Sequence, residues 1–468
     1  SAKSGIDVFR IFDALNWIEN MQVSIDEVLK SGKICEASIC YSGDLSSPSE
    51  KKYTLDYYLK MAEKLEKMGI HFLAIKDMAG LCKPKAAKIL FKELKKNIKI
   101  PIHFHTHDTS GNGVATLLNA SDVGVDIVDV AIDSWSGFTS QPSFGAMVES
   151  LDGNSRDPKI SSAVVRTAAN YWEGVRKQYQ PFESKVRTSM SEVYLHQMPG
   201  GQYTNLREQA RSMGITDERW PELASMYAEV NKIFGDVIKV TPISKVVGDM
   251  AIYMLANNIQ IEDVLDPKKD VGFPASVIEF FSGRLGQPYK GFPKALQKKI
   301  LKGKKPINYR FGSKLKPLNI KNRTAELEKK YSESISEKDT LSQIFFPEVF
   351  DEYMKHRQKF GNTSVIPTSN YFFGMNTGEE IYVSIEPGKT LIIRYFTLSE
   401  PNEKGFRTVY FELNGQPRSV DVKDNSIAVD DLAKEMADPS NIEHIAAPIP
   451  GLLVDVAVTE GIKVQKGA

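Results

Sequence analysis

The chain has 468 residues, enough for about three domains, and 41% of them are hydrophobic and 25% charged. Its 60 basic and 59 acidic residues give a formal net charge of +1, so charge gives no reason to expect nucleic acid or an anionic membrane as partner. No apolar run approaches the ~18 residues of a membrane span. The three cysteines form no CxxC pair, which argues against a disulfide framework and favours a reducing compartment. Because the first residues lack both a signal peptide's apolar stretch and a methionine, we expect the natural start upstream.

Short apolar runs alternate with amphipathic segments over the first 150 residues. Thr54 is a predicted N-cap of a helix that ends at Gly69, and Pro84 suits the first turn of the next helix. This βα alternation, with strands buried on both faces, predicts a parallel sheet. The predicted strands are 7–12, 36–41, 71–77, 100–108 and 126–133.

The polar residues of this region gather where the predicted strands end. A parallel sheet either closes into a barrel or stays open, and no GxGxxG follows a strand, which disfavours a dinucleotide-binding sheet. Active sites of (β/α)8 barrels lie at the C-terminal ends of the strands. We therefore predict an α/β fold, a TIM (β/α)8 barrel incomplete at its N-terminus, with its first strands upstream of Ser1. The polar residues at strand ends are Asp13, Asp44, Lys76, His107 and Asp133.

The remainder of the chain changes character twice. A largely helical stretch to about residue 310 is followed by a charged segment, 322–340, which predicts a solvated helix and linker. Residues 370–425 predict a small β-rich unit, in which Asn414-Gly415 marks a tight hairpin, and a last strand-rich fragment begins at His444. The helices expected before residue 310 are 158–178, 217–234, 244–257 and 293–302.

Residues 101–111, PIHFHTHDTSG, contain three of the chain's seven histidines. In a strand His103, His105 and His107 share one face, where a barrel interior would normally carry branched aliphatic side chains. A lone buried histidine is usually a hydrogen-bonded core residue. His105 and His107, however, lie ~6.6 Å apart along the backbone, and their imidazoles can converge on one metal ion. His103, one layer deeper, is expected either to support that site or to pack in the core.

Lys76 ends the neighbouring predicted strand, in AIKDMAGL. A lysine at a strand end commonly extends its ammonium group into solvent. Phe72 and Ala74 share its face, and Lys76 points into the barrel if they do. Desolvation would lower its pKa, and the neutral amine could add CO2 to give an anionic carbamate that ligates a cation. The spacing permits both alternatives. Asp77 and Asp108 follow on the opposite faces and are expected to be structural.

Six motifs occur together over nearly the whole chain, in one order. In that order they resemble the pyruvate carboxylase family, biotin-dependent ligases that make oxaloacetate from pyruvate. Two of the motifs, KDMAGL and HFHTHDTSGNG, are similar also to oxaloacetate decarboxylase and transcarboxylase subunits. The motifs are FRIFDALNW, KDMAGL, HFHTHDTSGNG, MPGGQYTNL, KVTPISKVVGDMA and GQPYKGFPKALQKKIL.

The resemblance implies a carboxyltransferase barrel with a divalent metal, Mn or Zn, held by His105, His107 and a carbamylated Lys76, which also counts as catalytic. An aspartate ligand on the family's first barrel strand, and a Gln and an Arg near the substrate, have no match in this chain. The ATP-dependent biotin carboxylase domain of the family has none either. The tail APIPG resembles the opening of a biotin carrier domain, but the biotin-bearing lysine, in Met-Lys-Met, is not present.

The resemblance also implies that Thr241, in VTPISK, shuttles a proton between the methyl group of pyruvate and biotin. Gln202, Ser244 and Lys245 match residues of the biotin pocket. The residues alone allow a structural alternative, in which Thr241 caps a helix and Pro242 is its first residue.

The resemblance and the changes of pattern along the chain imply partners, a compartment and four segments. The implied partners are pyruvate or oxaloacetate, the biotin carrier domain, further copies in a homotetramer, and acetyl-CoA as an effector, with no nucleic acid and no membrane. The implied compartment is the bacterial cytoplasm or the mitochondrial matrix. The segments are the carboxyltransferase barrel (1–180), its helical extension (181–315), a mixed α/β tetramerisation or allosteric domain (316–438), and the start of the carrier domain (439–468).

Rival functions are distinguished by particular features. A decarboxylase or transcarboxylase subunit would lack the β-rich region, and a metal-dependent Claisen-type condensing enzyme would not use a lysine such as Lys76 as a ligand. A non-catalytic assembly fragment is the rival outside catalysis. Carboxyl transfer from carboxybiotin to pyruvate is the function that the sequence favours.

Overall fold

The computed structural model describes residues 1–183, 188–402, 404–426, 437, 438, 441 and 444. The chain divides into two compact units, one formed by residues 1–315 and another that begins at Lys316. The carrier fragment expected at 439–468 falls, apart from two residues, outside the described part of the chain. None of the helices in the described ranges combines the length and apolar character needed to cross a membrane.

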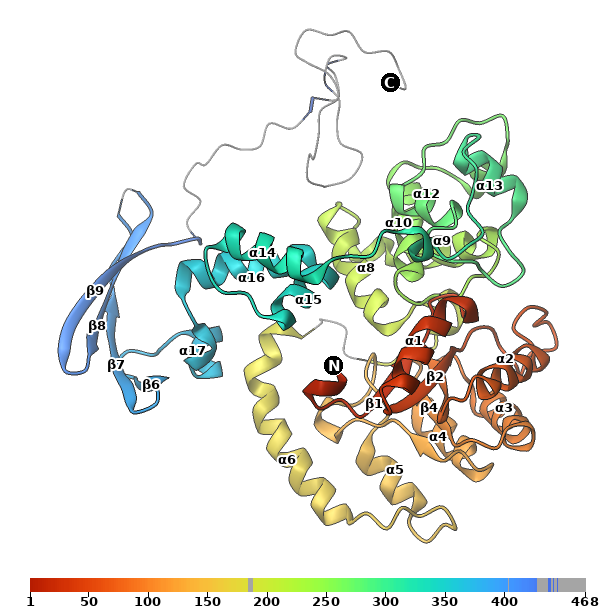
Figure 1. Ribbon diagram of the computed structural model, residues 1–468, viewed down its shortest axis with the longest axis horizontal. Helices are drawn as coiled ribbons and strands as arrows, with labels where there is room; N and C mark the ends of the chain where they lie inside the picture. The colour runs from red at the N-terminus through yellow and green to blue at the C-terminus, as the bar shows by residue number, and fades with distance from the viewer. Residues whose placement is uncertain (184–187, 403, 427–436, 439–440, 442–443, 445–468) are drawn as a thin grey trace. The chain divides into compact units, whose positions relative to one another are not determined.

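The first unit is built on a parallel sheet of five strands in the order β1-β2-β3-β4-β5, which confirms the predicted α/β architecture. Figure 1 shows these strands in red to orange with helices packed around them. The fifth strand is shorter than predicted, because beyond Val128 the chain makes only an isolated bridge from Ala131 to Ser143 and then a 3-10 turn. The strands are β1 (Val8–Ile11), β2 (Ile34–Cys40), β3 (Phe72–Asp77), β4 (Ile102–Thr106) and β5 (Ile127–Val128).

The two faces of this sheet differ in chemistry. The face toward the helices is apolar, with Ile39, Ile75 and Phe104 fully buried. The opposite, inner face carries charged and imidazole side chains where aliphatic residues are usual. Because alternate residues of a strand share a face, the inner set can be read from the register. It includes Arg10, Glu36, Ser38, Cys40, Phe72, Ala74, Lys76, His103 and His105.

The helices of this region begin and end where local signals predict. Thr54 Oγ1 accepts the backbone N–H of Tyr57 at the start of α2, Gly69 follows its end with a positive φ of 82°, and Pro84 is the first residue of α3. All three cysteines of the chain are buried thiols, and burial raises the pKa of Cys35 to about 11. The helices are α1 (Ile18–Lys30), α2 (Leu55–Lys67), α3 (Pro84–Asn97), α4 (Gly113–Asp122), α5 (Phe144–Leu151) and α6 (Ser162–Tyr179).

A helical extension completes the first unit and has its own apolar core, in which Tyr227, Phe234, Phe280 and Phe281 are fully buried. Helices α9, α10 and α13 confirm the last three expected helices, with shifted ends. The extension comprises α7 (Val193–His196), α8 (Gly200–Ser212), α9 (Trp220–Ile233), α10 (Ile243–Ala256), α11 (Ile261–Leu265), α12 (Ala275–Phe281) and α13 (Lys294–Leu301).

Lys239 is buried in this extension with 2% of its surface exposed, and its Nζ donates to Gln197 Oε1 at 3.0 Å. Burial lowers its pKa from 10.5 to about 8. Between about pH 8 and pH 10.5, Lys239 keeps its proton in the unfolded chain but loses it in the folded chain. The free energy of unfolding therefore rises with pH over this range, by up to about 3 kcal/mol. We expect Lys239→Met to remove that rise, measured as the difference between the two proteins in denaturant unfolding from pH 7 to 10. An equal pH slope in both proteins would contradict it.

The second unit combines helices with an antiparallel sheet of order β6-β7-β8-β9. Asn414 and Gly415 form the β8–β9 turn with φ of 49° and 80°, which confirms the predicted tight hairpin. The prediction of a solvated linker in 322–340 is wrong in part: two helices form there, and Leu327 and Tyr331 enter a small core with Phe350. The elements are α14 (Ile320–Tyr331), α15 (Glu337–Phe345), α16 (Pro347–Phe360), α17 (Thr368–Phe373), β6 (Glu380–Glu386), β7 (Lys389–Leu398), β8 (Phe406–Leu413) and β9 (Gln416–Lys423).

Candidate functional site

The histidine pair lies at the C-terminal end of β4, and its ring nitrogens converge. His105 Nε2 and His107 Nε2 are 3.3 Å apart. The other nitrogen of each ring is already engaged: His105 Nδ1 lies 2.7 Å from Asp129 Oδ2, and His107 Nδ1 lies 2.6 Å from the carbonyl oxygen of Thr139. Since a carbonyl only accepts hydrogen bonds, His107 carries its proton on Nδ1 and turns an unprotonated Nε2 toward His105.

Two imidazole lone pairs that face each other at this distance repel unless a cation lies between them or beside them. Burial lowers the pKa of His107 to about 4, so at neutral pH its Nε2 keeps a lone pair available to a cation. The residues therefore fit a divalent metal ion, for which neutral imidazole is a common ligand. In the described part of the chain, no three His, Cys, Asp or Glu side chains are arranged to hold a metal. A complete ligand set needs a group of another kind.

Lys76 lies on the same inner face as His105. It pairs in register with His105 across β3 and β4, so both side chains leave the sheet on the inner face. Its Nζ lies 5.2 Å from the ring centroid of Phe12, and burial lowers its pKa below the usual value for lysine. Lys76 is half-buried, and an ammonium group is also favoured above an aromatic ring such as that of Phe12. A lowered pKa favours the neutral amine that carbamate formation requires.

The loop after Lys76 is locked against the histidine segment. Asp77 is fully buried and accepts hydrogen bonds from the backbone N–H groups of Leu81 and Cys82 and from the hydroxyl of Thr106. Those contacts give it the structural role expected from the sequence. Asp108 has a similar role, because it accepts the N–H of Gly113 at the start of α4.

Gly80 makes the closest approach in this loop. A Cβ at this position would lie 2.5 Å from the carbonyl oxygen of His107, and its φ of 69° is unfavourable for other residues. We expect Gly80→Ala to displace His107 and to weaken metal binding by roughly 10-fold, the effect usual for a disturbed metal-ligand support. Titration with Mn²⁺ measures it. Gly69→Ala is the matched control, because φ there is 82° and no atom lies closer than 3.9 Å. Equal affinity in both variants would contradict the expectation.

Thr241 lies just before α10, whose N-cap is Pro242 with no side-chain capping bond. The alternative role of Thr241 as a helix cap is therefore wrong. Its hydroxyl is exposed and lies 3.5 Å from the hydroxyl of the buried Ser244, while Lys245 is exposed. Among the described residues no hydrogen bond joins Thr241 to Lys76 or to either histidine.

Gln202 lies on α8 against α10, since a Cβ at Gly248 would come within 2.7 Å of its Nε2. The start of α8 is also tied to the sheet: the N–H of Gly200 donates to the carbonyl oxygen of Met78, two residues after Lys76. A Cβ at Gly200 would lie 2.8 Å from Thr139, whose carbonyl binds His107. Helix α8 thus carries Gln202 to the same end of the sheet as the histidine pair.

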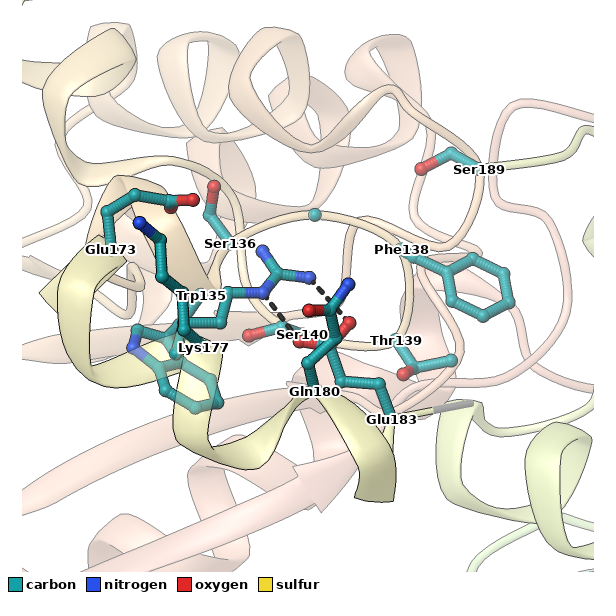
Figure 2. Close-up of a pocket in the computed structure, with 12 residues that line it drawn as sticks. Trp135, Ser136, Phe138, Thr139, Ser140, Glu173, Lys177, Gln180, Glu183 and Ser189 are labelled. Carbon is teal, nitrogen blue, oxygen red and sulfur yellow. Dashed lines mark hydrogen bonds and ion pairs between the residues drawn. The ribbon is translucent and has the colours of Figure 1, made fainter. Parts of the chain in front are cut away.

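A cavity of about 600 Å³ opens beside this end of the sheet. Figure 2 shows its two walls, the loop with Phe138, Thr139 and Ser140 on one side and the end of α6 with Lys177 on the other. Arg176, in the same wall, is fixed by a two-point ion pair with Glu183. The cavity shares Thr139 with the histidine site, although neither histidine nor Lys76 is among its described lining residues.

The sequence motifs do not identify the partners that hold the histidines. Asp129 accepts from both His103 and His105, and Arg10 and Glu36 complete the group. In the sequence these residues are charged positions on the inner face of predicted strands, whereas the strand-end pattern points to Asp133. Asp133 accepts the hydroxyl of Ser143 and the N–H of Gly145, which is a loop-forming role.

Comparison with known proteins agrees with this geometry. Residues 5–149 match the HMGL-like family model, and residues 193–394 match the model of a conserved carboxylase domain. The chain is 49% identical over 467 residues to pyruvate carboxylase of Bacillus subtilis and 44% identical over 469 residues to pyruvate carboxylase 1 of Caenorhabditis elegans. It covers 41% and 40% of these two proteins, so it spans about two-fifths of their length.

Solved structures extend the comparison to the fold. The carboxyl transferase domain of Rhizobium etli pyruvate carboxylase is 50% identical with a TM-score of 0.87, and the match covers 91% of this chain and 71% of that domain. The same domain in complex with pyruvate and biocytin matches equally well. The HMGL-like match agrees with the predicted barrel type. Taken with the histidine pair, the inner-facing lysine and the helical extension, these matches show that the chain belongs to the pyruvate carboxylase family and corresponds to its carboxyl transferase domain.

Proposed function

We propose that this chain transfers a carboxyl group from carboxybiotin to pyruvate and forms oxaloacetate, as part of a complete ATP- and bicarbonate-dependent pyruvate carboxylase. The observation that carries the proposal is the convergence of His105 Nε2 and His107 Nε2 at 3.3 Å beside the inner-facing Lys76. The solved carboxyl transferase domain with pyruvate and biocytin supports the choice of substrates.

His105, His107 and a carbamylated Lys76 would hold the metal, Mn or Zn. When bound, such a cation stabilises the negative charge that develops on oxygen as the methyl group of a ketoacid loses a proton. Burial lowers the pKa of Lys76, which favours the neutral amine that reacts with CO2.

The proton from the methyl group needs a carrier, and we assign that role to Thr241. A hydroxyl both donates and accepts, so it can pass a proton to biotin without acting as a strong base. The neighbouring hydroxyl of Ser244 lies 3.5 Å away, close enough to help orient it. Gln202, Ser244 and Lys245 would hold biotin, which is attached to a lysine of a carrier domain.

Further partners are part of the same proposal. Phe345, Phe346 and Val349 of the second unit each expose more than 60% of their surface, which suits a subunit interface of a homotetramer. Acetyl-CoA is proposed as an effector, since a related structure is described with this allosteric activator. Related proteins from a bacterium and from a yeast leave both the bacterial cytoplasm and the mitochondrial matrix open as the compartment.

The test uses the complete biotin-bearing protein with pyruvate, ATP and labelled bicarbonate. We expect labelled oxaloacetate that requires all three reactants. A decarboxylase or transcarboxylase subunit would consume oxaloacetate but give no ATP-dependent label. A non-catalytic assembly fragment would do neither, and either result would refute the proposal.

A further inference from the structure

One aspartate on the inner face contacts two histidines at once. Asp129 Oδ2 lies 2.7 Å from His105 Nδ1, and Asp129 Oδ1 lies 2.8 Å from His103 Nε2. The other nitrogen of His103 lies 2.7 Å from Glu36 Oε2. Both nitrogens of His103 therefore face carboxylates, which only accept hydrogen bonds, so both donate.

Arg10 completes this group on the same inner face, from β1 at the other edge of the sheet. It pairs in register with Glu36 and forms an ion pair with it, and its NH1 and NH2 each lie 3.3 Å from Asp129 Oδ2. Arg10 comes from β1 and Asp129 from the segment just after β5, so the group joins the first and the last strand of the sheet. We name Arg10, Glu36, His103 and Asp129 the inner polar layer.

The backbone fixes where this carboxylate lies. The N–H of Asp129 donates to the carbonyl oxygen of Phe104 at 3.1 Å, and Phe104 is the residue between His103 and His105. The Phe104 side chain is fully buried and packs on Phe91 with ring centroids 4.7 Å apart. The carboxylate is therefore anchored midway between the two histidines by a contact that neither histidine supplies.

We propose that Asp129 is a positioning residue, which through its bond to Nδ1 holds His105 in the tautomer and orientation that present Nε2 to the metal. The rest of the inner polar layer keeps Asp129 in place and balances its charge. Arg10 and His103 each donate to the Asp129 carboxylate, and both also donate to the carboxylate of Glu36. Metal ligands of this kind usually depend on such a carboxylate. The inference rests on the function proposed above and extends it to residues that never touch the metal or the substrate.

The decisive variant is Asp129→Ala in the complete protein, with Mn²⁺ as the probe. We expect the dissociation constant for Mn²⁺, measured from the electron paramagnetic resonance of free Mn²⁺, to rise roughly 10- to 100-fold. Asp126→Ala is the matched control. Asp126 lies before β5, where it accepts from Lys95 and from the N–H of Ile102, and its removal should leave the constant within about 2-fold.

A spectroscopic reading separates positioning from a loss of stability. Pulsed electron paramagnetic resonance detects the nitrogen of each imidazole bound to Mn²⁺. We expect two imidazoles in the wild-type protein and one in Asp129→Ala, while a merely structural role would lower the melting temperature and leave both imidazoles on the metal.

The outcomes are distinct. Wild-type protein that binds no Mn²⁺ through imidazole would refute the metal site of the proposed function itself. Wild-type binding with unchanged affinity and two imidazoles in Asp129→Ala would overturn the inference alone. Should Asp129→Ala not fold, Arg10→Met keeps the carboxylate and removes its support, and we expect roughly 2- to 10-fold weaker binding. Unchanged affinity there would overturn the inference as well.

Discussion

Replacement of both His105 and His107 by alanine is expected to strip the stoichiometric divalent metal from the complete protein and to lower oxaloacetate formation at least ~10³-fold. The two Nε2 atoms, 3.3 Å apart, are the only imidazole nitrogens that the described inner face leaves free for a cation. Without them the charge that develops on the ketoacid oxygen has lost its main stabilisation, which is typically worth 10²–10³ in rate for even one lost donor. Elemental analysis and a carboxylation assay measure the two effects.

The control for this experiment is His71→Ala, since the His71 ring accepts the N–H of Cys35 and lies at the opposite end of β3 from Lys76. Its metal content should equal that of the wild-type protein. Full metal content in the double variant would show that the cation, if any, is bound elsewhere.

Thr241→Ala is expected to abolish most oxaloacetate formation, by roughly 10²- to 10⁴-fold, while bicarbonate-dependent ATP cleavage continues. The hydroxyl makes no helix cap and its nearest described polar partner is Ser244, so its removal should leave α10 in place. The two partial reactions are measured separately in the complete protein. Metal content should be unchanged, which distinguishes this variant from the histidine pair.

Thr241→Ser is the complementary test of the relay role of the hydroxyl. It keeps the hydroxyl and removes a methyl group, and we expect it to retain carboxylation within about 10-fold of the wild-type rate. Near wild-type carboxylation by Thr241→Ala would refute the relay role, and inactivity of both variants would point to the methyl group as a packing contact instead.

Much of the fold follows from local patterns in the sequence. The strands were predictable because apolar runs end in polar residues, and Thr54, Pro84 and Asn414-Gly415 carry signals that depend on neighbours in sequence alone. The alternation of histidines in β4 fixed which imidazoles share a face. These features require no knowledge of distant contacts.

The remainder depends on contacts between distant segments. Asp129 lies within DIVDVAID, which reads as one continuous strand in the sequence. In the structure β5 ends at Val128, just before Asp129, and the chain then forms only an isolated bridge between Ala131 and Ser143. Arg10 is indistinguishable from a solvent-facing charge on a strand until Glu36 and Asp129 are seen beside it. Helix α14 likewise forms because Leu327 and Tyr331 have a core to enter, which the charge pattern of 322–340 does not reveal.

The burial of every native thiol has a practical consequence for measuring the movement of a carrier domain. Cys35, Cys40 and Cys82 are inaccessible and weakly acidic, with the pKa of Cys40 at about 12, so maleimide reagents should ignore them under gentle conditions. Within this chain a fluorophore or spin label can then be attached at one newly introduced cysteine, for example at the exposed Lys294, without deletion of Cys35, Cys40 or Cys82. The protein offers a ready background for following domain motion in solution.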